Sequence, residues 1–249
     1  MSALQKVPAI KLQWIALLLL AIYPIAIAAA RLDIWHFRNS FLLFVVAAVA
    51  GFVVLVISVL KMSHGDRQDS KALVISVAST LIPLIFLGSN IVKAKDFPFI
   101  HDISTDVANP PMLMAAKTDR VEGDHSVDYQ GPELAALQKA GYPDLASLTL
   151  SDAPEKVFAR SLSIIVGSGW DVLAKSNQQL PFTIEAVDTS MLFGFKDDIV
   201  VRIQQAPASE GGKPLTVVDV RSMSRQGKSD LGVNAKRIKQ LLTQIQAAQ

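Results

Sequence analysis

Histidine and aspartate residues gather in one short segment, and their side chains are of the types that bind Zn²⁺ or Mn²⁺. His101, Asp102 and Asp106 lie within six consecutive positions, and His125 and Asp128 follow. Neither histidine has a second histidine four residues away, and the chain has no HExxH motif. In such a run, aspartate, serine and threonine side chains commonly hydrogen-bond to nearby backbone amides and shape a turn. We therefore expect a structural segment that binds no metal or other cofactor.

A second set combines arginine and aspartate in the C-terminal third of the chain. Its members are Arg202, Asp219, Arg221, Arg225, Asp230 and Arg237. Guanidinium groups bind phosphate or carboxylate through two parallel hydrogen bonds, and a turn that enters a helix presents free backbone N–H groups to an anion. We predict that this set binds an anionic ligand. The alternative is a ladder of ion pairs between strands, with Asp230 capping the last helix.

Other catalytic signals are weak. Asp197 and Asp198 form a paired carboxylate of the kind that general acid and base catalysis uses. Adjacent residues of a strand point to opposite faces, so we expect a turn or cap role for them. The chain has no cysteine, which excludes disulfides, zinc–thiolate sites and thiol catalysis, and it lacks the G-x-S-x-G, Walker and G-x-G-x-x-G motifs. These absences favour a noncatalytic protein.

The elements that must position these side chains follow residue 150. Asp152 and Glu155 have the spacing of a capping box before a helix that Gly167 ends, and a last helix is expected over residues 232–246. Four segments rich in valine and isoleucine are expected to be strands: residues 170–174, 183–188, 199–204 and 215–223. This order predicts a two-layer α+β domain, in which two helices cover one face of an antiparallel sheet of about four strands.

Alternation along these strands predicts which side chains share a face. Arg202 lies between Val201 and Ile203, whose side chains point to the other face of the strand. Asp219 and Arg221 alternate with Val218 and Val220 in the same way. With Glu185, these three are expected to gather on the sheet face that the helices leave open. The open, charged face is thus the predicted ligand-binding surface.

The first third of the chain has a different composition. Residues 1–92 hold 7 Lys/Arg and 3 Asp/Glu, whereas residues 93–249 hold 17 and 19. Three uncharged stretches, residues 12–30, 41–60 and 72–92, are each long enough to cross the hydrocarbon core, at about 1.5 Å per helical residue. We predict three transmembrane helices within residues 1–92, an extended segment over 93–130 and an extramembrane domain over 131–249. The first stretch has a cleaved signal peptide as its alternative.

Flanking cations predict the orientation of the spans. Those expected on the cytoplasmic side are Lys6, Lys11, Lys61, Arg67 and Lys71, and those on the other side are Arg31, Arg38, Lys93 and Lys95. The majority on the first side predicts a cytoplasmic N-terminus and an extracytoplasmic domain. No span contains aspartate, glutamate, lysine, arginine or histidine, which argues against a transporter or channel. The net charge of +2 comes mainly from cations beside the spans, so no nucleic acid partner is expected.

Several motifs in order resemble the domain-of-unknown-function 1499 family over about residues 96–245. They are HDISTD at 101–106, NPP at 109–111, YP at 142–143, GW at 169–170, IEA at 184–186, GFKDDIVVR at 194–202, VDVRSMSR at 218–225 with Gly227, SDLG at 229–232, NA at 234–235 and RI at 237–238. The resemblance implies a bacterial or plastid protein, several of whose relatives carry apolar N-terminal spans. It implies no activity, and Ser104 and residues 112–114 depart from the pattern of many relatives.

Together these features predict a noncatalytic, multi-pass protein of the bacterial inner (plasma) membrane. Its partners are expected to be the lipid bilayer and an anionic ligand, a lipid headgroup or an envelope protein that the extracytoplasmic domain binds. One alternative is a membrane-tethered hydrolase, with or without metal, that uses residues 101–106. A second alternative is an accessory subunit whose spans bind a larger membrane complex.

Overall fold

The computed structural model describes residues 9–32, 34–63, 70–206 and 214–248. Of the predicted flanking cations, Lys6 and Arg67 lie outside these ranges, and the side chains of Lys11, Lys71 and Lys93 are also outside the described set. The chain forms two compact units. The first comprises Met1–Lys93 with Met191–Gly194, and the second comprises Ala94–Ser190 with Phe195–Gln249.

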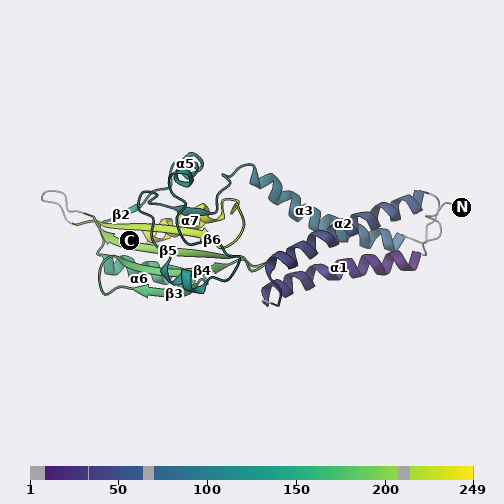
Figure 1. Cartoon of the computed structure of the whole chain (residues 1–249), viewed down its shortest axis with the longest axis horizontal. Helices are drawn as coiled ribbons and strands as arrows, with labels where there is room; N and C mark the ends of the chain where they lie inside the picture. Colours follow the sequence, from purple (N-terminus) through teal and green to yellow (C-terminus); the bar gives the residue numbers. More distant parts are fainter. Residues whose placement is uncertain (1–8, 33, 64–69, 207–213, 249) are drawn as a thin grey trace. The chain divides into compact units, whose positions relative to one another are not determined.

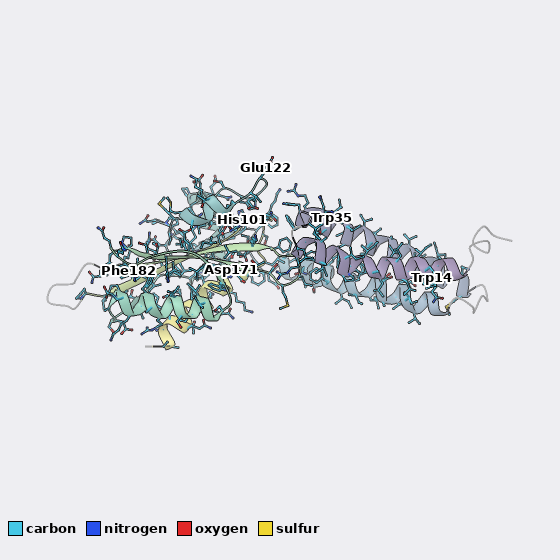
Figure 2. All side chains as sticks on the ribbon, turned by 90° about the horizontal axis from the view of Figure 1, so that it is seen from below. Trp14, Trp35, His101, Glu122, Asp171 and Phe182 are labelled. Atoms are coloured by element: carbon cyan, nitrogen blue, oxygen red, sulfur yellow. The ribbon has the colours of Figure 1, made fainter. Side chains whose placement is uncertain are left out.

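The first unit consists of three helices that are long and apolar enough to span a membrane, as predicted. They are α1 (Ala9–Arg31), α2 (Phe37–Ser63) and α3 (Ser70–Ala94) (Figure 1). Small residues lie at the helix contacts: a Cβ atom on Gly51 would come within 3.2 Å of the Ser79 hydroxyl, which is typical of close packing in lipid. Trp14 and Trp35 lie toward opposite ends of this unit (Figure 2), the usual place of tryptophan in a membrane span.

The second unit is built on one antiparallel sheet of six strands. They are β1 (Asp102–Ser104), β2 (Leu148–Leu150), β3 (Asp171–Ser176), β4 (Phe182–Thr189), β5 (Lys196–Gln205) and β6 (Thr216–Ser224). The order is β1-β6-β5-β4-β3, and β2 pairs with the first residues of β6 on the same edge as β1. The four predicted strands are confirmed as β3 to β6. The two additional strands have three residues each, which is too short for an alternating pattern to show.

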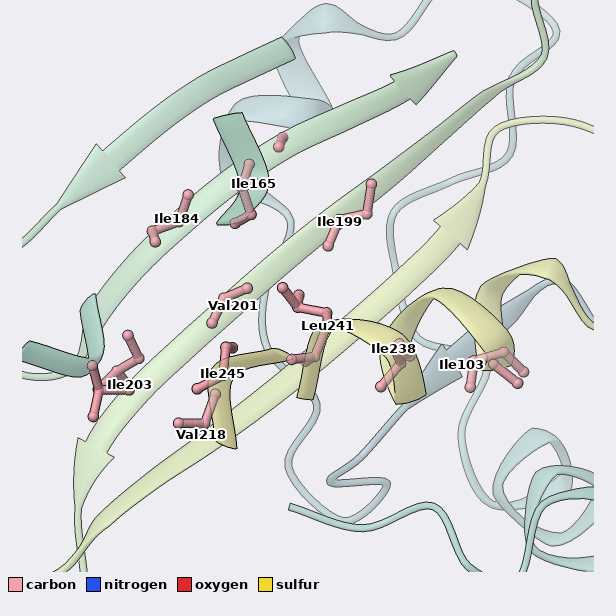
Figure 3. Packing of buried hydrophobic residues seen from close by; sticks show 14 of the residues in the cluster. Ile103, Ile165, Ile184, Ile199, Val201, Ile203, Val218, Ile238, Leu241 and Ile245 are labelled. Carbon is pink, nitrogen blue, oxygen red and sulfur yellow. The ribbon is translucent and has the colours of Figure 1, made fainter. Parts of the chain in front are cut away.

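Four helices accompany the sheet. They are α4 (Met114–Asp119), α5 (Pro132–Gly141), α6 (Pro154–Gly167) and α7 (Val233–Ala247). As predicted, α6 and α7 cover one face, and their apolar side chains pack on those of the central strands (Figure 3). Ile199, Val201 and Ile203 of β5 are fully buried against residues such as Ile165 and Ile238. This layer is the main hydrophobic core.

The starts of α6 and α7 differ in how they are capped. The capping box predicted for Asp152 and Glu155 is not formed, because the N-cap residue is Ala153 and the Asp152 carboxylate pairs with Arg160 at 2.8 Å. Asp230, in contrast, accepts hydrogen bonds from the backbone N–H groups of Gly232 at 3.0 Å and Asn234 at 2.8 Å. Asp230 therefore satisfies two backbone amides at the start of α7, as the capping alternative predicted, although the N-cap residue itself is Gly232.

The second face of the sheet is covered, which corrects the expectation of an open face. The segment expected to be extended over residues 93–130 contains β1 and α4. A small second core forms beneath it from Leu113, Ala116, Val200 and Met223. Both elements are shorter than the windows in which periodicity can be recognised, so composition alone favoured an extended segment.

Candidate ligand-binding site

Arg221 of β6 joins its strand to the segment that covers the second face. Its Nε and Nη2 atoms donate to the two carboxylate oxygens of Asp102 at 2.9 and 2.8 Å. The same guanidinium donates to the backbone carbonyl groups of Pro111 at 3.2 Å and Val127 at 2.8 Å. The Arg221 and Asp102 side chains are 3% and 0% exposed. Each of the three nitrogen atoms of this guanidinium thus already donates to a partner within the protein.

Arg202 and Asp219 form a second buried pair on the same face. Nη2 of Arg202 donates to Asp219 at 2.8 Å and to Asp106 at 3.0 Å. Asp219 also accepts hydrogen bonds from the Ser147 hydroxyl and from the Gln204 amide. Asp106 therefore fixes the covering segment to the sheet instead of pointing toward a metal or a substrate.

Asp198 is the centre of a third group. Its fully buried carboxylate accepts from Arg225 at 2.7 Å and from Arg120 at 2.7 Å. Arg225 also pairs with Asp119 at 2.7 Å. Burial opposes the charged form of Arg225, but its hydrogen bonds with Asp198 and Asp119 outweigh burial and raise its pKa. Asp119 and Arg120 end α4, so this group anchors the short helix.

Arg237 lies on the opposite face, among residues of the helix layer. Its Nη2 atom donates to Asp188 and Asp197, both at 2.7 Å, and Nη1 donates to the Ser222 hydroxyl at 3.0 Å. Burial lowers the affinity of the side chain for its proton, yet the two carboxylates raise the pKa of Arg237 overall. Asp197 and Asp198 thus point to opposite faces, as the alternation of a strand requires.

The predicted anion-binding set therefore does not form one surface. The sheet separates Arg237 and Asp230 from Arg202, Arg221 and Arg225, and each of the four arginines already has a carboxylate partner. We call these residues, with their aspartate partners, the Arg–Asp network. Sequence analysis gave no role to Asp119 and Asp188, nor to Arg120, which also pairs with Asp198, and it expected only a turn or cap role for Asp198. The parity that placed Arg202 on the second face also places Asp198 there, and this signal was available.

Glu185 of β4 also has a structural role. Its carboxylate accepts hydrogen bonds from the backbone N–H groups of Met114 at 3.1 Å, Ala115 at 2.9 Å and Ala116 at 3.1 Å. These are the free amides of the first turn of α4, where the helix dipole favours a negative charge. Glu185 thereby fixes the start of α4, and the Arg–Asp network fixes its end.

The residues considered for a metal site lie in three different environments. Asp102 binds Arg221, and Asp106 binds Arg202 and accepts from the backbone N–H of Asn109 at 2.9 Å. His101 instead stacks on His125, with ring centroids 4.1 Å apart and planes inclined by 23°. Among the described residues, no three or more histidine, aspartate or glutamate side chains are arranged to hold a metal ion.

A pocket of about 400 Å³ opens beside this histidine pair. It is lined by Phe99, Ile100, His101, His125, Gln130, Glu133, Leu134, Leu137 and Lys228. His101 is 7% exposed, and its Nε2 atom is buried without a hydrogen-bond partner. The Nε2 atom of His125 hydrogen-bonds to the carbonyl group of Gly227 at 2.9 Å. His101 thus lines a hollow of suitable size for a small ligand, and its Nε2 atom lies buried without a protein partner.

The surroundings of His101 disfavour its protonated form. Burial lowers the pKa of His101 most, and the nearby His125 and Arg120 lower it further. Asp102 and a hydrogen bond with the backbone of Lys228 act in the opposite direction, without reversing the shift. A neutral imidazole offers one donor and one acceptor nitrogen.

Sequence analysis missed most of this pocket. The helix α5, which supplies Glu133, Leu134 and Leu137, was not predicted, although Pro132 in its first turn and two leucines three residues apart are helix signals. Lys228 comes from the turn between β6 and α7, about one hundred residues further along the chain. Only the fold brings these residues together.

A second hollow of about 160 Å³ lies beside Arg221 and Tyr129. The Tyr129 hydroxyl has no hydrogen-bond partner, and burial, with a smaller contribution from Asp102, raises its pKa to about 12. Arg221 is already bound to Asp102, and the volume of this hollow is less than half that of the larger pocket.

Comparison with known proteins identifies the family of the second unit. No curated protein matches the sequence. The family described as protein of unknown function (DUF1499) matches residues 102–245. The match covers the Arg–Asp network and all six strands, and it begins one residue after His101. Three helices of membrane-spanning length and composition precede the matched residues. The chain belongs to the DUF1499 family.

Proposed function

We propose that this chain is a noncatalytic binding protein of the bacterial inner (plasma) membrane. Three helices anchor it, and its DUF1499 domain binds a small ligand on the extracytoplasmic side. The observation that carries the proposal is the buried, unpartnered Nε2 atom of His101 in the wall of the 400 Å³ pocket. We therefore assign the ligand site to this pocket instead of to the Arg–Asp network, where the sequence predicted it.

An unpartnered buried nitrogen is energetically unfavourable. Leaving such a group unsatisfied costs about 1–3 kcal/mol, because water no longer hydrogen-bonds to it. A ligand that reaches Nε2 after a small rotation of the His101 ring would recover this loss. In the Arg–Asp network each arginine is already paired with a carboxylate, so the network offers a ligand no unpaired buried charge.

The alternative functions receive less support from the geometry. A hydrolase that uses residues 101–106 would need His101, Asp102 and Asp106 near one reacting atom, and these side chains have separate partners. An accessory role in a membrane complex remains a second proposal. Its support is the set of apolar side chains on the outside of the helical unit, for example Val49, which is 60% exposed.

Native mass spectrometry of the full-length protein, extracted from its own membrane in mild detergent, tests the binding function. We expect the wild-type protein to carry a bound molecule. Leu137, which is 52% exposed in the pocket wall, is replaced by tryptophan to fill the pocket. Leu137→Trp should lose the bound molecule. Val166→Trp, at a 60% exposed position of α6, is the matched control and should retain it. Equal occupancy in all three proteins would exclude this pocket.

The orientation of the domain is tested separately. Because the chain has no cysteine, Lys236→Cys at an exposed position of α7 gives a single labelling site. We expect a membrane-impermeant maleimide to label this cysteine in spheroplasts without lysis. Labelling only after lysis would place the domain in the cytoplasm.

A further inference from the structure

The His101 pocket is lined by both apolar and charged side chains. Phe99, Leu134 and Leu137 form apolar surface, and Phe99 and Leu137 are 68% and 52% exposed. Glu133 and Lys228 bring one negative and one positive charge to the same pocket. A ligand that fills it would therefore meet both hydrocarbon and two opposite charges.

The two charges have no ion-pair partners within the described part of the chain. Glu133 lies in the first turn of α5, and Lys228 lies between β6 and α7. All four arginines of the Arg–Asp network, in contrast, have carboxylate partners at 3.0 Å or less. Glu133 and Lys228 thus remain available to a ligand while sharing one pocket.

We propose that the pocket recognises a zwitterionic amphiphile. A primary ammonium group pairs with Glu133, an anionic oxygen pairs with Lys228, and an apolar portion packs on Phe99 and Leu137. The His101 side chain lines the same pocket. This inference rests on the proposed binding function and specifies its ligand class. Charge-assisted hydrogen bonds to both ends of the head group would give more selectivity than either charge alone.

The bilayer is the favoured source of such a molecule. Phe99 follows the last residue of α3, Ala94, by only five residues, so the chain contributes to the pocket wall soon after it leaves the third candidate span. An aminophospholipid has the required ammonium, phosphate and acyl chains. A free apolar amino acid or short peptide has the same chemistry and is the second source to be tested.

Binding of water-soluble probes to the full-length protein in a nonionic detergent tests the inference. The probes are dihexanoyl-phosphatidylethanolamine, dihexanoyl-phosphatidylcholine and the dipeptide Leu-Leu, and the readout is the apparent affinity from the shift in the unfolding midpoint. We expect phosphatidylethanolamine to bind about tenfold more tightly than phosphatidylcholine, whose ammonium has no N–H donor. Tighter binding of the dipeptide than of either lipid would support the same recognition with an aqueous source.

Charge-removing variants identify the two contacts. Glu133→Gln and Lys228→Gln should each weaken phosphatidylethanolamine binding by about tenfold. Two matched controls should leave it unchanged. Glu155→Gln alters the glutamate that follows the first proline of α6, as Glu133 follows that of α5, and Lys236→Gln alters an exposed lysine of α7.

Two results would overturn the inference. Equal binding of phosphatidylcholine and phosphatidylethanolamine would show that the ammonium donors are not recognised, and unchanged affinity in both charge-removing variants would show that neither charge contacts the ligand. The proposed binding function would survive either result if Leu137→Trp still abolished binding. If Leu137→Trp bound every probe as wild type does, both proposals would fail.

Discussion

Replacing Asp198 by alanine should destabilise the DUF1499 domain more than any other single change in the Arg–Asp network. The carboxylate is fully buried and receives four side-chain N–H groups, two from Arg120 and two from Arg225. In Asp198→Ala, Arg225 keeps Asp119, which is 50% exposed. Arg120 keeps only the backbone carbonyl group of His125 among the described residues. One nearly buried guanidinium is thus left without a counter-charge.

The size of the effect follows from this loss. Breaking a buried ion pair by removing one partner costs about 3–5 kcal/mol, because the remaining charge stays desolvated. Retention of Asp119 by Arg225 places the expected loss for Asp198→Ala toward the lower end of this range. Total stabilities of about 5–15 kcal/mol make this a large fraction. With a urea dependence of about 2 kcal/mol per M, the midpoint should fall by roughly 1.5–2 M.

Urea unfolding of the full chain in detergent measures this change. The fluorescence of Trp170 reports on unfolding of the domain once Trp14 and Trp35 are replaced by phenylalanine. The Trp170 ring lies within the folded domain, with its centroid 6.0 Å from the Arg237 guanidinium. The control is Asp144→Ala, which removes the partner of Lys239 in an ion pair whose side chains are 43% and 68% exposed and should leave the midpoint unchanged. A loss below about 1 kcal/mol in Asp198→Ala would refute the structural role of the network.

Two further predictions concern buried polar atoms outside the network. Tyr142→Phe should raise the free energy of unfolding by about 1 kcal/mol in the same urea assay, because the Tyr142 hydroxyl is buried without a partner. Burial, aided by Asp230, raises the pKa of Tyr142 to about 12, so its ultraviolet ionisation signal should be absent at pH 11. For His101 the pKa is lowered, mainly by burial, so the unfolded chain takes up the proton first and stability falls as pH drops through the unfolded value of about 6.5. His101→Phe should therefore lose less stability than wild type between pH 7.5 and 5.5, and an identical loss would contradict the shift.

Sequence patterns predicted the sheet well because its central strands are long and strictly alternating. Ile199, Val201 and Ile203 share the helix-covered face, and Arg202 lies on the other face, as alternation requires. The same pattern cannot reveal what covers that second face. The cover is a six-residue helix with the loops around it, held by hydrogen bonds with the side chains of residues such as Glu185 and Arg221, and the three-residue strand β1 joins the edge of the sheet. Neither element has enough residues to show a period.

The candidate site was less predictable, because residue type does not say whether a polar group is already satisfied. Arginines near aspartates suggested a ligand surface, yet Arg221 and Asp102 satisfy one another through two hydrogen bonds. His101 suggested a turn, yet its Nε2 atom is the buried polar atom without a partner in the larger pocket. Both outcomes depend on partners between about 20 and 120 positions away in the sequence, such as His125 and Arg221.

Satisfaction of buried polar groups also explains why two kinds of charged residue behave differently in one domain. Asp198 and Arg225 must stay together, since separating them leaves a buried charge unpaired, and this fixes α4 to the sheet. Glu133 and Lys228 lie at exposed positions, where water stabilises each charge alone, so the fold does not need to pair them. Such charges are available for binding without a loss of stability. A ligand site beside the rigid network is therefore compatible with a stable fold, whereas a site within the network would require its ion pairs to break.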